Sequence, residues 1–163
     1  MSVMDRNPEA VNAFVERFAS ALVDSGMPRT PSRIFAVLLA TDSGRLTAAE
    51  LAERLQVSPG AISGAVRYLL QLNLIAREHE PGSRRDRYRV YDDIWYELYR
   101  QQEPLYARFT QSARDGVEAL GPDTDAGRRL AEMVAYFEFI LAEMPALHER
   151  WRERRATLRA QQP

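Results

Sequence analysis

Several kinds of chemistry are excluded by what this sequence of 163 residues lacks. It contains no cysteine, which excludes disulfides, zinc–thiolate sites and cysteine nucleophiles. The two histidines, His79 and His148, lie far apart, and neither a glycine-rich phosphate loop nor a nucleophile elbow is present. We therefore expect no catalytic residues, no metal, no cofactor and no enzymatic activity.

Long hydrophobic runs are also missing. No apolar run approaches the ~18 residues that a membrane span needs. The first ten residues, MSVMDRNPEA, lack the basic and then apolar layout of a signal peptide. A cytoplasmic protein is expected.

Lysine is absent as well, so all 22 basic residues are arginine, and they are unevenly distributed. Residues 29–91 hold ten arginines and six acidic residues, a balance of +4. The remainder holds twelve arginines and seventeen acidic residues, a balance of −5, and the formal net charge is −1. Because local charge counts for more than the total when a surface meets phosphate, residues 29–91 are the candidate for contact with nucleic acid.

Two short helices are predicted in the middle of that segment, joined by about three residues. Thr47 and Glu50 match a capping box, which opens the first helix. Ser58 followed by Pro59 is typical of a cap and first turn, which open the second. This is the spacing of a helix-turn-helix, whose second helix can enter a DNA major groove.

The second helix carries two glycines on the face opposite its apolar stripe. Ile62, Val66 and Leu69 repeat at helical spacing and should point inward. The outward face holds Gly60, Ser63, Gly64, Arg67 and Gln71. An interior glycine costs a helix about 1 kcal/mol against alanine. Either these glycines let another surface come close, as on DNA, or Gly60 lies in a tolerant first turn and Gly64 packs against a neighbouring helix.

A β-hairpin is predicted directly after the two helices. Residues 74–80 and 87–92 are short and rich in β-formers, with Pro-Gly as a turn signal between them. With the helices, this hairpin makes a winged helix over about residues 29–91. Its arginines are Arg84, Arg85, Arg87 and Arg89.

The arginines of the hairpin have two readings. An arginine at the tip suits a narrow A·T-rich minor groove, where the negative potential is enhanced. The other reading is a solvated hairpin tip. Arg87 and Arg89 could serve phosphates or pair with Glu78 and Glu80.

Helices are predicted on both sides of the winged helix. Asn7 and Pro8 start one that ends at Gly26, and a long amphipathic pattern continues to the C-terminus. Pro104 is expected to kink or break that pattern near residues 100–103, and Pro145 is expected to mark a break or restart. The apolar faces of residues 8–24 and 128–158 are too long to stay in water, and two-fold pairing would bury them. An aromatic stripe with Trp95, Tyr99 and Tyr106 either lines a ligand cavity or belongs to the core.

The stretch from Leu46 to Tyr91, LTAAELAERLQVSPGAISGAVRYLLQLNLIAREHEPGSRRDRYRVY, resembles the winged-helix DNA-binding domain of the MarR superfamily. Within that superfamily it looks most like the GbsR-like branch, and the preceding MPRTPSRIFAVLL is similar to that branch too. The resemblance implies a homodimeric repressor or activator. Its terminal helices would form the dimer, Ser63 and Arg67 would enter the major groove, and a wing arginine would reach the minor groove.

The wing departs from the common MarR pattern of Asp-x-Arg followed by Leu-Thr. Here Ser83-Arg84-Arg85-Asp86-Arg87 and VYDD stand in its place. Which arginine forms the tip is therefore left open.

The sequence thus predicts a mostly helical protein with a small β-wing. Residues 1–28 form an N-terminal dimerisation helix, 29–92 a winged helix-turn-helix, and 93–163 a C-terminal helical dimerisation region. We expect a transcriptional regulator that binds double-stranded DNA at a pseudo-palindromic operator, with a small molecule as a candidate effector. The competing hypothesis is a winged helix used for protein contact, without DNA. The residues expected to contact DNA are Ser58, Gly60, Ser63, Gly64, Arg67, Gln71, Arg84, Arg85 and Arg87.

Overall fold

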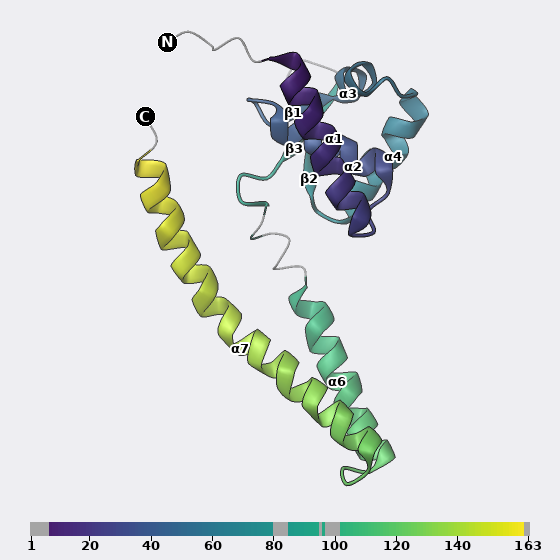
Figure 1. Ribbon diagram of the computed structural model, residues 1–163, viewed down its shortest axis with the longest axis vertical. Helices are drawn as coiled ribbons and strands as arrows, with labels where there is room; N and C mark the ends of the chain where they lie inside the picture. Colours follow the sequence, from purple (N-terminus) through teal and green to yellow (C-terminus); the bar gives the residue numbers. More distant parts are fainter. Residues whose placement is uncertain (1–6, 80–84, 95, 97–101, 162–163) are drawn as a thin grey trace. The chain divides into compact units, whose positions relative to one another are not determined.

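The computed structural model describes residues 7–79, 85–94, 96 and 102–161. The chain divides into two compact units, Met1–Glu97 and Leu98–Pro163. The described residues of the first unit include four helices and three strands, and those of the second unit include two helices (Figure 1).

The first unit is built around helix α2. Helix α1 (Pro8–Asp24) begins as expected, because the Asn7 side chain accepts a hydrogen bond from the backbone N–H of Glu9 at 3.0 Å. Helix α2 (Arg29–Ala40) packs beside it, and its residues Ile34, Phe35 and Leu38 are at most 1% exposed. These three side chains form the centre of the core. Burial of each contributes on the order of 1.5–3 kcal/mol.

The helix-turn-helix forms where the sequence predicts it. Helix α3 (Ala48–Leu55) starts with the complete capping box of Thr47 and Glu50. Gln56 ends α3 in the left-handed conformation, with φ of 54°, and so turns the chain sharply. Helix α4 (Pro59–Gln71) follows after this turn, capped by Ser58.

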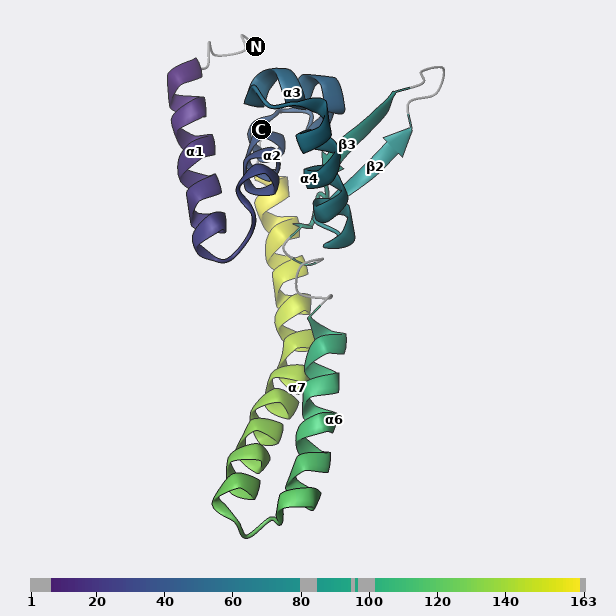
Figure 2. The same ribbon diagram turned by 90° about the vertical axis from the view of Figure 1, so that its right-hand side faces the viewer.

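The hairpin and the short extended segment before α3 form one antiparallel sheet in the order β1-β3-β2. The strands are β1 (Arg45–Thr47), β2 (Ile75–His79) and β3 (Asp86–Val90). Leu46 and Ile75 are at most 3% exposed and anchor the sheet to the core. The β2–β3 hairpin, which we call the wing, extends outward beyond α4 (Figure 2). Residues 80–84 of the wing lie outside the described residues.

The second unit is an antiparallel pair of helices, α6 (Glu103–Leu120) and α7 (Asp125–Ala160). The prediction of a break near Pro104 is confirmed, because α6 begins at Glu103 with Pro104 in its first turn. The Phe137 ring packs against Tyr106 and Phe109, with centroids 5.2 and 6.0 Å apart. These rings join the two helices.

The prediction of a helix break at Pro145 is wrong. Helix α7 runs from Asp125 to Ala160 with Pro145 inside it, as one curved ribbon in Figure 1. An interior proline removes one hydrogen bond and crowds the carbonyl four residues earlier, at a cost of about 3 kcal/mol. The neighbours Glu143, Met144, Ala146 and Leu147 all favour helix. A curve can relieve the crowding, so the helix continues.

The described part of the second unit buries little. Its only buried residues are Thr110, Ala113 and Gly127. Many of its large apolar side chains are exposed, and a helix pair with so small a core has little to stabilise it alone. The exposed ones are Phe109, Leu120, Tyr136, Phe139, Leu147, Trp151 and Leu158.

Candidate nucleic-acid interface

Helix α4 has the two faces that its sequence predicts. Ile62, Val66 and Leu69 are at most 2% exposed and fix the helix against the core. The residues expected on the other side are all exposed: Gly60, Ser63, Gly64, Arg67 and Gln71. The buried stripe holds α4 against the core, so the helix presents all five of these residues to solvent.

Both glycines of α4 face open space. A Cβ atom added at Gly60 or Gly64 would meet no atom within 4 Å in the part of the chain that the structure describes. The alternative that Gly64 packs against a neighbouring helix is therefore wrong. Packing within the described chain would therefore allow a larger residue at position 64. Glycine nevertheless stands there, at a cost of about 1 kcal/mol of helix stability.

The first turn of α4 leaves one backbone donor for a ligand. Pro59 has no N–H, the Ala61 N–H donates to Ser58 Oγ at 3.2 Å, and the Ile62 N–H donates to the Ser58 carbonyl at 3.1 Å. The Gly60 N–H makes no hydrogen bond with the residues that the structure describes. A phosphate at this helix end would thus meet the Gly60 N–H, with the Ser58 hydroxyl proton beside it.

We expect Ser58→Ala to lower the free energy of unfolding by about 1 kcal/mol, because it removes the N-cap of α4. Urea unfolding followed by circular dichroism measures this. The matched control is Ser63→Ala on the same helix, which removes an exposed hydroxyl without a cap bond and should change the free energy by less than about 0.5 kcal/mol. Equal losses in the two variants would contradict the capping role.

Arg67 lies on the outward face, one turn beyond Ser63. Its side chain is exposed and makes no hydrogen bond or ion pair with the described residues. A guanidinium in this position can offer both of its donor edges to a partner. Arginine uses such a pair of donors to bind guanine O6 and N7.

The wing arginines differ in their surroundings. Arg84 lies outside the described residues, and Arg85 is exposed. Arg87 is half-buried and stands directly across from Thr47 in the β1–β3 register. Its Nε atom is buried. Arg87 is therefore held against the start of α3.

The electrostatics of Glu50 agree with this placement. Hydrogen bonds from the backbone and then the side chain of Thr47 hold the pKa of Glu50 below its usual value. The positive charges of Arg87 and Arg54 lower this pKa further. Arg87 thus lies near the capping box of α3.

Arg89 makes the ion pair that the sequence offered as an alternative to phosphate contact. Its Nε pairs with the Glu78 carboxylate on β2, which also lies 3.6 Å from Nη1 of Arg45 on β1. This cluster ties all three strands together. Glu80, the other suggested partner, lies outside the described residues.

The aromatic stripe gives little support to a ligand cavity. Trp95 and Tyr99 lie outside the described residues. Tyr106 is half-buried, and its ring packs on Phe137 within the α6–α7 pair. This contact fits the core reading of Tyr106.

Two further kinds of feature are absent from the described residues. None of the helices there combines the length and apolar character needed to cross a membrane. Likewise, no three His, Asp or Glu side chains of that part of the chain gather where they could hold a metal ion.

Comparison with known proteins settles the family. Residues 25–86 match the family model of the MarR family, and residues 93–154 match the model of MmpR5-like MarR family transcriptional regulators. The chain is 31% identical over 134 residues to the HTH-type transcriptional regulator MmpR5 of Mycobacterium tuberculosis, covering 80% of this chain and 81% of that protein. The chain belongs to the MarR family of transcriptional regulators. As a member of this family, the chain is a DNA-binding transcriptional regulator with a winged helix. Its relatives are transcriptional regulators and not enzymes.

Solved structures agree with the MarR assignment. A crystal structure of a transcriptional regulator superposes with a TM-score of 0.77 at 27% identity, over 88% of this chain and 99% of that one. TrmBL2, an archaeal chromatin protein, superposes with a TM-score of 0.52 at 16% identity, over 65% of this chain and 40% of its own. The second likeness concerns the fold alone.

Proposed function

We propose that this MarR-family regulator binds a pseudo-palindromic operator as a homodimer, with α4 in the major groove and the wing tip at the adjacent minor groove. The observation that carries the proposal is the open outward face of α4, where Gly60 and Gly64 leave room for a close approach. Occupying the operator would block or assist RNA polymerase. On the sequence resemblance we also propose that the chain belongs to the GbsR-like branch. We further propose that it acts on DNA in the cytoplasm.

The predicted residues at the start and along the outward face of α4 each have a role in this arrangement. Arg67 reads a base edge, with Ser63 beside it and Gln71 at the fringe of the contact. Ser58 and Gly60 bind a phosphate through the start of the helix. These contacts would fix the helix in the groove and read sequence at its centre.

For the wing tip we propose Arg84 or Arg85, because an arginine suits the negative potential of a narrow minor groove. Arg87 was also expected to touch DNA. Its place opposite Thr47 favours a different role, in which it braces β3 against the start of α3.

Dimerisation would involve the helices that flank the winged helix. Exposed apolar side chains occur on α1, at Phe14 and Val23, and along α7, at Tyr136, Phe139 and Trp151. A second copy would remove these side chains from water. Two-fold symmetry would then place two recognition helices about 34 Å apart, one turn of DNA.

The direct test is an electrophoretic mobility shift with the DNA upstream of the chain's own gene, at about 50 and 200 mM salt. We expect specific binding that weakens at least about tenfold at the higher salt, because arginines displace counterions from phosphates. Absence of binding at both salt concentrations would instead support the protein-contact module without DNA.

Substitutions of Arg85 and Arg87 should differ in how strongly DNA binding depends on salt. Arg85→Ala is expected to weaken binding and to reduce the slope of log affinity against log salt by about one per protomer, because a phosphate or groove contact is lost. Arg87→Ala is the matched control. It should weaken binding and lower the melting temperature while leaving the slope unchanged. Equal slopes for wild type and both variants would contradict a DNA contact by Arg85.

A further inference from the structure

The outer end of the wing carries a histidine, His79, that has no role in the DNA contacts proposed above. His79 is the last residue of β2 and stands directly across from Asp86, the first residue of β3. Its Nδ1 lies 3.4 Å from one carboxylate oxygen of Asp86, and the other oxygen lies 3.7 Å from Nε of Arg77. One carboxylate therefore lies between a permanent positive charge and a titratable group.

These groups share one face of the wing. Residues directly opposite each other in an antiparallel pair lie on the same face, and so do alternate residues along one strand. Among the described residues, the charged or titratable groups on the face of His79 are Arg77, Asp86 and Tyr88. Glu78 lies on the opposite face, where it pairs with Arg89. The exposed Arg85 directly precedes Asp86 in the chain.

The charge of the three groups depends on one proton. With a neutral imidazole, Arg77 and Asp86 cancel each other, and with an imidazolium the set carries a charge of +1. The side chain of His79 is 70% exposed, and an exposed ion pair contributes little, so Asp86 leaves the imidazolium available to a further anion. Its Nε2 makes no hydrogen bond with the described residues, and in the imidazolium this nitrogen is a donor.

The length of the wing tip brings His79 to the DNA backbone when the tip enters a minor groove. Only residues 80–85 separate His79 from Asp86, so at about 3.3 Å per residue the tip reaches at most about 10 Å beyond them. The minor groove is about 7.5 Å deep, so a tip that fills it places both strand ends at the groove edges, where the phosphates lie. We propose that His79, in its protonated form, binds a backbone phosphate through Nε2 and makes operator binding depend on pH. This inference rests on the proposed DNA binding by the wing.

DNA binding then takes up a proton at each wing. A phosphate favours the imidazolium over the neutral imidazole, so by linkage the affinity rises as the pH falls through the range in which histidine titrates. The gain is present below that range and is lost above it. Histidine side chains and the terminal amine are the groups that ordinarily titrate between about pH 6 and 8 in a chain without cysteine. This chain has two histidines, so a pH dependence can be traced to one side chain.

The test is fluorescence anisotropy of the full chain with the DNA upstream of its own gene, at constant ionic strength and at about pH 6 and pH 8. We expect binding at least about fivefold tighter at the lower pH, because each protomer takes up a proton. His79→Gln should reduce this difference to less than about twofold. His79→Arg keeps a positive charge throughout, so at the higher pH it should bind about as tightly as wild type does at the lower pH. Both variants should keep the wild-type melting temperature, because the His79 side chain is mostly exposed.

Two further variants separate the ways in which a proton acts. His148→Gln is the matched control, because it removes the other histidine, on α7, and should keep the full pH dependence. Asp86→Asn removes the carboxylate beside His79. If protonation only neutralised Asp86, this variant would bind equally at both pH values, whereas a direct phosphate contact predicts that the pH dependence persists.

A second measurement uses the wild-type chain alone. In NMR titrations of the imidazole resonances, DNA should move the titration midpoint of His79 up by at least about half a pH unit. The proposal is overturned if this midpoint does not move, if wild-type binding does not change with pH, if His79→Gln keeps the pH dependence, or if His148→Gln or Asp86→Asn removes it. In each of these cases the chain still binds DNA, so the proposed function stands. Absence of DNA binding at both pH values would overturn the proposed function and this inference together.

Discussion

Arg67→Ala is expected to weaken operator binding by at least about 30-fold while affecting nonspecific DNA much less. A bidentate arginine–guanine contact discriminates by about 1–3 kcal/mol, a homodimer would make two of them, and each 1.4 kcal/mol is tenfold. Since Arg67 makes no hydrogen bond or ion pair with the described residues, its loss should leave the melting temperature unchanged. Fluorescence anisotropy with operator and with scrambled DNA measures the two affinities.

Arg67→Lys is the matched variant. Lysine keeps the positive charge but cannot present the paired donors of a guanidinium. We expect it to restore nonspecific binding and not operator binding. If Arg67→Ala weakens both DNAs equally, Arg67 contacts phosphate only.

Gly64→Leu is expected to stabilise the folded chain and to impair operator binding. Leucine is a far better helix former than glycine, and a Cβ at this position meets open space, so the free energy of unfolding should rise by about 0.5–1 kcal/mol. The same side chain would hold α4 away from the groove edge. We expect operator affinity to fall at least tenfold. Urea unfolding and fluorescence anisotropy measure the two effects.

Gln71→Leu is the control for Gly64→Leu. Gln71 lies seven residues further along α4, on the same exposed face but at the fringe of the proposed contact. Its replacement should change operator affinity less than about threefold, since a fringe side chain contributes little discrimination. Wild-type operator binding by Gly64→Leu would mean that this part of α4 does not enter the groove.

Local patterns predicted the helix-turn-helix well. The capping box at Thr47, the Ser58-Pro59 start and the apolar repeat of α4 each act over a few residues. The exposure of Arg67 follows from the same repeat. The sequence left two explanations for the glycines, and the geometry around Gly64 contradicts the packing one.

Features that depend on distant residues were harder to predict. Arg87 lies opposite Thr47 only because β1 and β3 pair, and these strands lie about forty residues apart in the sequence. The prediction at Pro145 failed for a different reason. The rule that proline ends a helix was applied to a stretch whose neighbouring residues all favour helix, and α7 continues through it.

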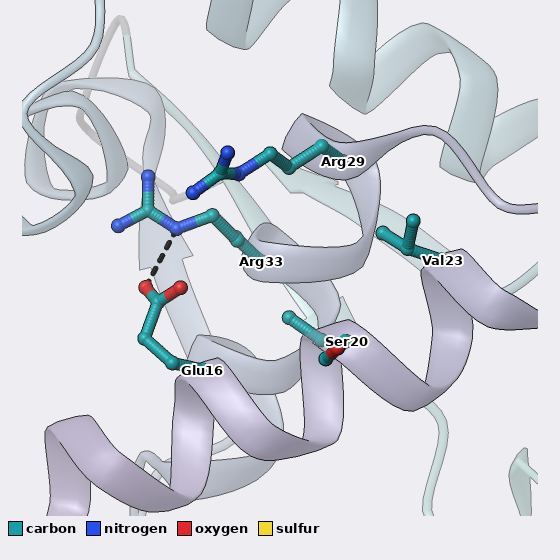
Figure 3. Close-up of a pocket in the computed structure, with 6 residues that line it drawn as sticks. Glu16, Ser20, Val23, Arg29 and Arg33 are labelled. Carbon is teal, nitrogen blue, oxygen red and sulfur yellow. Dashed lines mark hydrogen bonds and ion pairs between the residues drawn. The ribbon is translucent and has the colours of Figure 1, made fainter.

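The ion pair between Arg33 and Glu16 (Figure 3) was not predicted, because Glu16 reaches Arg33 only through the packing of α1 on α2.

The most direct test of the central claim uses the absence of cysteine. A single cysteine at Ser63→Cys can carry an iron–EDTA cleavage reagent, with Gln111→Cys on α6 as the control site. If the open face of α4 enters the major groove of each half-site, the Ser63→Cys conjugate will cut the operator in two clusters about 10–10.5 base pairs apart. Scattered cuts, or none within the operator while the protein remains bound, would contradict the account.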